Sequence, residues 1–323
     1  MGRETSIEWT HHTFSPWRGC SKVHTGCTHC YAEKNAARNP RIFGEWGDNG
    51  TRVIASEAMW REPMKWNRAA EAAGEQRRVF CASLADVFED RPELEAPRRR
   101  LFDLIERTPW LTWLLLTKRP GKFAREAMAE WEQHCRDHGV EFPRERVWIG
   151  GSIADQRTTE DILPHLMDLR QFASVLFVSY EPAIGPVDLT AVEPYFLRDM
   201  KDKSKFDPII RHNVLTGLVS GMDEYHAKID WVICGGESGP NARPCDVAWI
   251  RSIVQQCQAA GTACFVKQLG GNPRAFNPRH QWYDGTDFRE GGVTLLPLSD
   301  RKGGDPEEWC EDLRVREFPK GRE

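Results

Sequence analysis

Short apolar runs alternate with amphipathic stretches along most of the chain, from about residue 78 to residue 268. Each run is followed by small, polar or charged residues; the runs cover residues 79–84, 113–118, 147–152, 174–179, 230–236 and 263–268. Near-continuous apolar runs of this length are typical of strands that are buried on both faces, as in parallel sheets. The pattern therefore predicts six parallel strands, and we expect an additional strand near residues 7–9.

The stretches between these runs carry apolar residues at helical spacing. The clearest helix follows Asp246, a capping residue, and ends at Gly261. Further helices are predicted at about residues 93–107, with Arg98, Arg99 and Arg100 on the solvent face, and after Thr158 within residues 157–170. Strands and helices in alternation predict βαβ units with right-handed crossovers. The expected class is α/β, an open, partial β/α barrel of six or seven mainly parallel strands.

Two regions interrupt this alternation. About forty residues, from about 188 to 228, separate two predicted strands, which is too long for a simple crossover and indicates an insertion or lid. Beyond residue 270 the chain is rich in Gly, Pro, Arg and Asp. We predict one barrel domain over residues 1–270 and an irregular C-terminal extension over residues 271–323.

Composition narrows the setting of the protein. Hydrophobic residues make up 40% and charged residues 28% of the 323 residues, which is ordinary for a globular chain. No stretch approaches the ~20 apolar residues of a membrane span, and the first residues show no signal core, so we expect a cytoplasmic protein without a membrane partner. The net charge of -4 provides no global basic field for nucleic acid, but it allows a local basic groove.

Candidate binding residues stand at the carboxyl ends of the predicted strands, where the loops of β/α folds converge. They are Ser83, Asp86, Thr117, Lys118, Ser152, Asp155, Glu181, Gly235, Gly236 and Glu237. Charged groups beside buried strands have to be paired or face a ligand. The short side chains among them are equally typical of helix caps, and Lys118 and Glu181 could pair with each other. The two glycines fit either a backbone cradle for a ligand or a tight turn.

Three cysteines, Cys20, Cys27 and Cys30, lie within eleven residues of a loop at about residues 18–33. In a reducing compartment such a group indicates metal or redox chemistry rather than disulfides. The C-x2-C pair has no second C-x2-C elsewhere, although Cys20 with His24 or His29 could complete a zinc site. Three thiolates are also what a four-iron four-sulfur cluster needs when its fourth iron is left open.

Six motifs together carry a resemblance to a known family: RGCSKVHTGCTHCYAE, ASLADVFE, LLLTKRP, GGSIADQRT, SYEPAIGPVDL and GGESGPNARP. In this order, over about residues 6–270, they resemble the phage-associated three-Cys-motif family of uncharacterised proteins, which are similar to radical S-adenosylmethionine enzymes. The Cys-Tyr-Ala junction and the Thr-Lys strand end are more distantly similar to spore photoproduct lyase. This chain has C-x6-C-x2-C where the superfamily usually has C-x3-C-x2-C, and its Gly-Gly-Glu stretch lies late.

The resemblance implies a partial barrel and two cofactors, a four-iron four-sulfur cluster and S-adenosylmethionine. Cys20, Cys27 and Cys30 would bind the cluster as metal ligands, and the strand-end residues would hold the cofactor or substrate, with Lys118 and Arg157 as anion contacts. Ser83 and Asp86 would be the candidates for binding the methionine amino group of the cofactor. The reduced cluster would cleave S-adenosylmethionine to a 5'-deoxyadenosyl radical that takes hydrogen from a substrate.

The substrate expected from the resemblance is a nucleobase, nucleotide or nucleic acid. Trp9, Trp17 and Trp46 flank the cysteine loop and are candidates for base stacking. Two other functions remain open from the residues. One is a zinc-stabilised nucleic-acid-binding protein without catalysis, and the other is an iron–sulfur scaffold whose barrel mouth is occupied by a protein partner.

Overall fold

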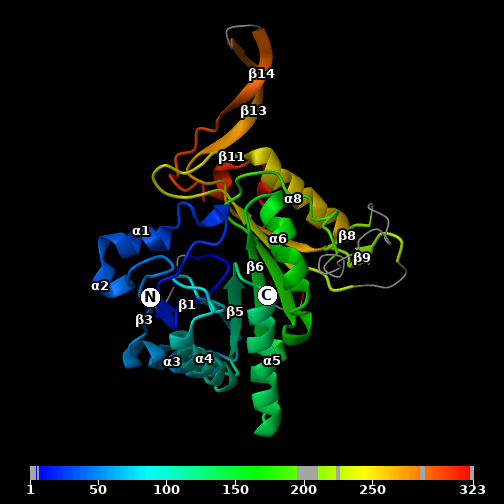
Figure 1. Ribbon diagram of the computed structural model, residues 1–323. Coiled ribbons are helices and arrows are strands. Elements are labelled where there is room, and N and C mark those ends of the chain that lie inside the picture. The colour runs from blue at the N-terminus through cyan, green and yellow to red at the C-terminus, as the bar shows by residue number, and fades with distance from the viewer. Residues whose placement is uncertain (1–4, 6, 195–209, 223–225, 284–287, 321–323) are drawn as a thin grey trace. The chain divides into compact units, whose positions relative to one another are not determined.

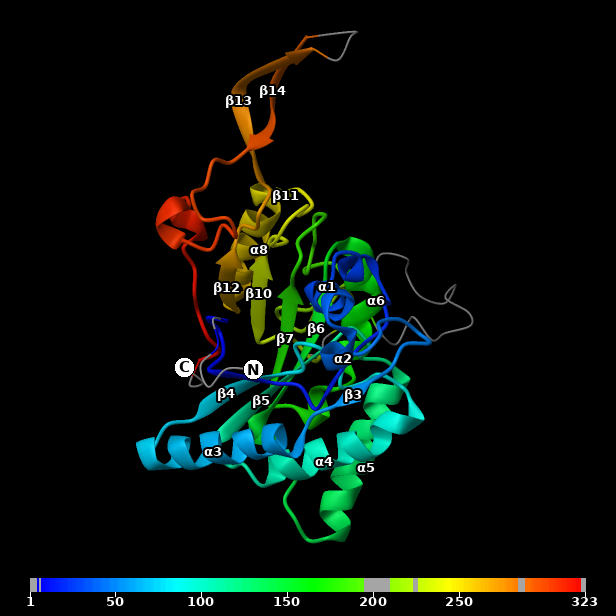
Figure 2. The ribbon, with the colours of Figure 1, turned by 90° about the vertical axis from the view of Figure 1, so that its left-hand side faces the viewer.

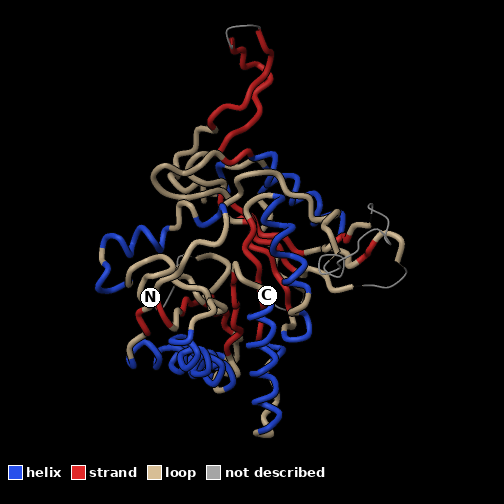
Figure 3. The backbone as a smooth tube through the Cα atoms, in the orientation of Figure 1, coloured by secondary structure: helices blue, strands red, loops and turns tan. Residues whose placement is uncertain are grey.

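The computed structural model in Figure 1 describes residues 5, 7–194, 210–222, 226–283 and 288–320; within residues 276–294 it describes the backbone alone. Along the chain, strands and helices alternate, as the tube coloured by secondary structure shows (Figure 3).

Seven strands form the main sheet, in the order β1-β4-β5-β6-β7-β10-β12. Their bounds are β1 His12–Phe14, β4 Arg77–Cys81, β5 Leu111–Thr117, β6 Val147–Ile153, β7 Val175–Tyr180, β10 Trp231–Gly235 and β12 Ala263–Gln268. Neighbours pair in parallel, and the sheet is open because β1 and β12 stand at its two edges. All six predicted apolar runs are strands, so the prediction of an open, partial β/α barrel is confirmed.

Burial explains why these runs form strands. Every residue of β6 and β7 is buried, and all but one of β5 are, which is the pattern of a sheet covered on both faces. Gly150 lies where β6 passes the ring of Phe177, and a Cβ atom there would stand 2.3 Å from that ring. Only glycine allows this approach.

The first strand lies later in the chain than predicted. Residues 8 and 9 form a turn, closed by a hydrogen bond from Thr10 N to Ile7 O at 3.2 Å. The strand is His12–Phe14, which pairs with Val79–Cys81 of β4. Trp9 is buried against the ring of Phe80, so its apolar character serves packing rather than a strand.

The predicted helices are present. They are α4 Glu95–Glu106, α6 Gln156–Met167 and α8 Val247–Ala260, and the N-terminal half adds α1 Tyr31–Arg38, α2 Pro40–Phe43, α3 Glu57–Ala73 and α5 Lys122–Asp137. Asp246 caps α8 by accepting from Ala248 N at 2.9 Å, and Gly261 ends the helix with φ of 66°. Both signals were readable in the sequence because each is a local requirement of the helix end.

The chain divides into two compact units. Unit 1 comprises Met1–Ser152 and Ile162–Phe177, and unit 2 comprises Ile153–Asp161 and Val178–Glu323. Figure 2 shows, in its blue and cyan part, the helices α3 and α4 beside β4 and β5 of unit 1. No helix in the described part of the chain is long and apolar enough to cross a membrane.

The insertion and the C-terminal extension differ in regularity. The described part of the insertion includes a short hairpin, β8 His212–Asn213 with β9 Leu218–Val219, while residues 195–209 and 223–225 lie outside the described residues. The extension is more regular than predicted, because β13 Pro273–Tyr283 and β14 Phe288–Leu295 form an antiparallel pair that joins β11 Cys245–Asp246. Its Gly and Pro content conceals these strands from a pattern based on apolar runs.

Candidate functional site

The cysteine loop follows β1 and the short strand β2 Trp17–Arg18. Cys27 is buried, Cys20 and Cys30 are half-buried, and none of the three forms a disulfide. A 3-10 turn at Thr25–Cys27 is capped by His24, whose Nδ1 accepts from Gly26 N at 2.9 Å. Cys30 N donates to Cys27 O at 3.3 Å, and α1 begins directly after Cys30. Local turn structure thus determines the positions of Cys27 and Cys30.

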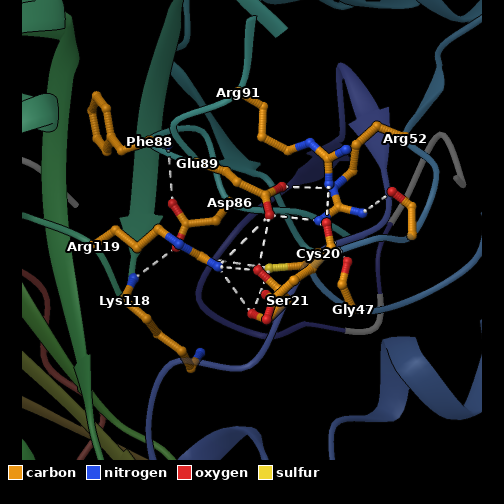
Figure 4. A network of polar contacts seen from close by, with 12 residues as sticks. Cys20, Ser21, Gly47, Arg52, Asp86, Phe88, Glu89, Arg91, Lys118 and Arg119 are labelled. Atoms are coloured by element: carbon orange, nitrogen blue, oxygen red, sulfur yellow. Dashed lines mark hydrogen bonds and ion pairs between the residues drawn. The ribbon is translucent and has the colours of Figure 1, made fainter. Parts of the chain in front are cut away.

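Cys20 is placed differently, because a residue from the end of β5 contacts it (Figure 4). Arg119 Nη1 lies 3.4 Å from Cys20 Sγ, and Nη2 donates at 3.0 Å both to the carbonyl and to the hydroxyl of Ser21. The backbone of Cys20 is fixed as well, since its carbonyl accepts from Gly47 N at 3.0 Å. The first cysteine is therefore tied to the carboxyl end of a central strand.

Asp86 holds the loops after β4 and β5 together. Its Oδ1 accepts from Phe88 N at 3.0 Å and from Thr117 Oγ1 at 2.7 Å. Its Oδ2 accepts from Lys118 N at 2.9 Å and forms an ion pair with Arg119 at 3.2 Å. Because four protein donors occupy both oxygens of this buried carboxylate, Asp86 acts as a structural centre and not as a free ligand for an amino group.

A second carboxylate, Glu89, completes this group in unit 1. Arg52 donates to both of its oxygens, at 2.7 and 2.6 Å, and both side chains are almost entirely buried. Ser21 Oγ donates to Glu89 at 3.1 Å, and Arg119 lies 3.7 Å from it. The carboxylates of Asp86 and Glu89 thus pair with the guanidinium groups of Arg52 and Arg119 next to the cysteine loop. Buried charges require such partners.

Arg98 contradicts the prediction that it lies on a solvent face. The residue is buried, with 5% exposure, and its guanidinium donates to Val87 O at 2.8 Å and to Glu89 O at 2.6 Å. It also stacks over the ring of Phe123, 4.6 Å from the ring centre. The prediction failed because the carbonyl groups that Arg98 binds come from the preceding loop, which helical periodicity does not reveal.

The electrostatics of Cys20 follow from these neighbours. Burial raises the pKa of the Cys20 thiol to about 11, the carboxylates of Asp86 and Glu89 act in the same direction, and Arg119 opposes them. Burial alone would lower the pKa of Arg119, but Asp86 and the Cys20 sulfur outweigh it and raise that pKa. Without a metal, Cys20 is therefore a neutral thiol beside a permanent cation.

The donor set fits an iron–sulfur cluster in type and number. Three thiols free of disulfides stand on one loop after the first strand, and the Arg119 guanidinium adjoins the first of them, Cys20. The sulfurs are not gathered around one point: in the described ranges, no three His, Cys, Asp or Glu side chains are arranged to hold a metal ion. A zinc site completed by His24 or His29 is likewise not assembled there.

The other predicted residues of unit 1 lie at strand ends as expected. Thr117 is buried, and its hydroxyl also accepts from Arg119 N at 2.8 Å. The Lys118 side chain extends away from Asp86 (Figure 4). The carbonyl of Ser83 accepts a hydrogen bond from the Tyr31 hydroxyl at 2.5 Å, and Ser152 is buried at the end of β6.

In unit 2, Glu181 and Lys267 form the main ion pair at the strand ends. Lys267 Nζ lies 2.8 Å from Glu181 Oε1, and Ser179 Oγ lies 3.4 Å from the other oxygen. Gly235 lies close to them, since a Cβ atom there would stand 3.3 Å from Glu181 Oε1. Glu181 therefore pairs with Lys267, a residue of β12.

The Gly-Gly-Glu stretch begins at the end of β10 and packs tightly against the chain after β12. A Cβ atom at Gly236 would stand 2.2 Å from Leu269 O, so the chain itself fills the space that a ligand would need. Glu237 is buried and binds Arg243, which donates from its backbone N at 2.8 Å and from Nη2 at 2.7 Å. Gly235 ends β10, and the turn of this motif lies further on, at Pro240 and Asn241.

Asp155 caps α6. Its Oδ1 accepts from Thr158 N at 2.8 Å, while Thr158 Oγ1 accepts from Asp155 N at 3.0 Å, so the two residues form a reciprocal capping box. Thr158 was predicted to cap this helix, and it does so as the partner of Asp155.

Two of the three tryptophans near the loop are part of the core. Trp9 is 2% and Trp17 0% exposed, whereas Trp46 is half-buried. Trp9 and Trp17 therefore do not offer a face for base stacking.

Most of the chain matches one known protein family. Residues 4–294 match a family model described as "Protein of unknown function (DUF5131)". The chain belongs to this family. No curated protein and no solved structure matches it significantly.

The segment that matches DUF5131 contains both groups of strand-end residues and the cysteine loop. Sequence reasoning missed three of the residues that surround Cys20, namely Arg52, Glu89 and Arg119. Arg119 and Glu89 lie within two of the six motifs, LLLTKRP and ASLADVFE, and this was the only signal available. Arg52 carries no local signal, because only the fold brings it to Glu89.

Proposed function

We propose that this protein is a radical S-adenosylmethionine enzyme that binds a four-iron four-sulfur cluster through Cys20, Cys27 and Cys30. The proposed substrate class is a nucleobase, nucleotide or nucleic acid, and the reaction is a base modification or a lyase step. All ten cysteines are free thiols, which supports a reducing, cytoplasmic setting.

One observation carries the proposal. A loop with three free thiols follows the first strand of an open, parallel half-barrel, and the first thiol is held by a cation from the end of β5. Three thiols leave one iron of a cubane cluster open for a cofactor. A structural zinc site would instead need a fourth ligand.

When bound, such a cluster supplies one electron that cleaves S-adenosylmethionine and yields a radical able to remove hydrogen from a substrate. The protein's own residues bind and orient the reactants. In unit 1 the groups left for this role are Ser83 and Lys118. Asp86 is saturated by its neighbours, and the buried Thr117 hydroxyl already binds Asp86 and Arg119 N. In unit 2 the Glu181–Lys267 pair offers both charges, whereas Asp155 and Glu237 already serve a cap and an ion pair.

Cluster binding has to bring the three sulfurs together. Metal binding and local folding are commonly coupled in such sites, and thiol ligands release protons on binding. The longer C-x6-C spacing adds little to the entropic cost of closing the loop, because this cost grows only with the logarithm of loop length. We therefore propose that residues 22–30 rearrange when the cluster binds.

The experiment measures iron, sulfide and zinc in anaerobically purified protein, followed by incubation with dithionite and S-adenosylmethionine. We expect about four irons per chain and formation of 5'-deoxyadenosine. Cys27→Ala should lose both, while Cys310→Ala, at an exposed cysteine of unit 2, should keep both.

Three results would contradict the proposal in different ways. Stoichiometric zinc without a reconstituted cluster would indicate a structural metal site, with salt-sensitive nucleic-acid binding as its expected activity. A cluster without cleavage of S-adenosylmethionine would indicate an iron–sulfur scaffold for a protein partner. Unchanged iron in Cys27→Ala would remove Cys27 from the ligand set.

A further inference from the structure

We infer that Arg119 is a positioning residue that holds Cys20 in place and donates a hydrogen bond to its sulfur in the cluster-bound protein. The inference rests on the proposed function for the cluster, but the contact between Arg119 and Cys20 belongs to the protein itself. It assigns a role to a residue that lies outside the three-cysteine motif.

The guanidinium reaches the loop at three points. Nη1 lies 3.4 Å from Cys20 Sγ, and Nη2 donates to the Ser21 carbonyl and to the Ser21 hydroxyl, both at 3.0 Å. Because the guanidinium is planar and carries five fixed donors, it can bind the sulfur and the next backbone carbonyl at the same time. A lysine could supply the charge but not this geometry.

Two buried carboxylates, Asp86 and Glu89, hold the Arg119 side chain in place. Asp86 Oδ2 accepts from it at 3.2 Å, and Glu89 lies 3.7 Å away. Arg52, fully buried, fixes Glu89 with two hydrogen bonds. Arg98 fixes the same loop by binding the carbonyl groups of Val87 and Glu89. Together these contacts restrict the Arg119 guanidinium to the position in which it contacts the Cys20 sulfur (Figure 4).

Cys27 and Cys30 have no comparable support. Within the described residues, neither of their thiols makes a hydrogen bond or an ion pair; their positions follow from the turn at Thr25–Cys27 and the start of α1. Cys20 is therefore the fixed ligand of the three. The six residues between Cys20 and Cys27 provide the chain length with which the other two can close onto it.

A chemical consequence follows for the loaded protein. Hydrogen bonds to the sulfur ligands are among the factors that set the reduction potential of an iron–sulfur cluster. A charged donor stabilises the additional electron of the reduced cluster. Arg119 should therefore raise the cluster's potential relative to a variant that lacks this donor.

The first test compares Arg119→Met, Arg119→Lys and the control Arg99→Met in the full chain. Arg99 is an exposed residue of α4 in the same unit and forms an ion pair with Glu95. The cluster potential is measured by redox titration followed by electron paramagnetic resonance. We expect a lower potential in Arg119→Met, a smaller shift in Arg119→Lys, and the wild-type value in Arg99→Met. An unchanged potential in an Arg119→Met protein with full iron content would overturn the inference.

The second test uses metal-free protein and does not depend on the cluster. A double-mutant cycle with Cys20→Ala and Arg119→Met compares the unfolding equilibrium constants in urea. We expect the two changes to be non-additive by at least about twofold, since contacting residues couple. Strict additivity would overturn the inference. Coupling in a protein that takes up no iron would keep Arg119 as the residue holding Cys20 and would instead reject the proposed function.

Discussion

At the scale of single residues, the candidate site depends on buried charges that satisfy one another. Asp86 and Glu89 are 4% exposed, and the Arg52 side chain is fully buried. A buried ion pair contributes little net stability compared with apolar residues of similar size, but removal of one partner leaves the other charge uncompensated. We therefore interpret the ion pairs of Asp86, Glu89 and Arg52 as contacts that fix the position of Arg119 next to the cysteine loop.

Replacement of Asp86 tests this interpretation. Asp86→Asn removes the charge opposite Arg119 and replaces one acceptor oxygen with an amide that cannot accept from Lys118 N or Arg119. We expect the free energy of unfolding to fall by about 3 kcal/mol, the lower end for a broken buried pair. Urea denaturation followed by circular dichroism measures the change.

The matched control is Asp90→Asn, an exposed carboxylate four residues further along, which should stay within about 0.5 kcal/mol of wild type. Equal effects of the two substitutions would show that Asp86 is not a structural centre.

At the scale of secondary-structure elements, strand-end residues divide into those that terminate helices and those that remain for a ligand. Asp155 belongs to the first group through its capping box with Thr158. Gly236 ends no helix, but the backbone of Leu269 packs against it and leaves no room for a ligand there. Ser83, Lys118 and the Glu181–Lys267 pair form the second group, so the set of candidate contacts becomes smaller than the motif pattern implied.

The capping box on α6 can be dissected by mutation. Asp155→Ala and Thr158→Ala should each lower the free energy of unfolding by about 1 kcal/mol, because each removes an acceptor for an otherwise unpaired backbone N–H group. The double variant should lose less than the sum, since the two hydrogen bonds are reciprocal. Thermal or urea unfolding provides the measurement.

The control is Arg157→Ala, at an exposed position between the two capping residues, where we expect a change within about 0.5 kcal/mol. If Asp155→Ala left stability unchanged, its role would have to be sought in ligand binding.

At the scale of the whole molecule, each unit contains a histidine kept neutral by its surroundings. In unit 1, burial, followed by the charges of Arg78, Arg77 and His12, lowers the pKa of His11 to about 4. Its Nδ1 accepts from Arg78 N at 2.9 Å, which requires an unprotonated nitrogen. In unit 2, burial and then the neighbouring His226 lower the pKa of His212 to about 4.

Acid should therefore destabilise the protein through both units. The unfolded chain protonates these histidines near pH 6.5 and the folded chain only near pH 4, so the unfolded state binds more protons in between. The stability that they contribute is fully present above pH 6.5 and is lost as the pH falls from about 6.5 to 4. Urea midpoints at a series of pH values measure this loss.

A variant with His11→Asn and His212→Asn should have a flatter pH dependence over this range, because asparagine can accept a hydrogen bond but does not titrate. The same slope in wild type and double variant would contradict the assignment to these two histidines.

Much of the fold was predictable from the sequence, for local reasons. Six apolar runs became strands because short runs of this kind suit a sheet covered on both faces, and Asp246 and Gly261 end α8 because helix termini favour these residue types. The β13–β14 pair was missed because its strands are rich in polar residues and glycine. The cysteine loop was recognised because its three thiols are close neighbours in the chain.

The partners of the site were decided by tertiary structure. Arg119 meets Cys20 across 99 residues of sequence, and Arg98 turns inward to a preceding loop. Glu181 binds Lys267 from a strand near the end of the main sheet. The type of a side chain and its spacing from others determine what it can bind, and both can be read from the sequence. Which group it does bind depends on strand order and on the course of loops, because ion pairs and hydrogen bonds act only over a few ångströms.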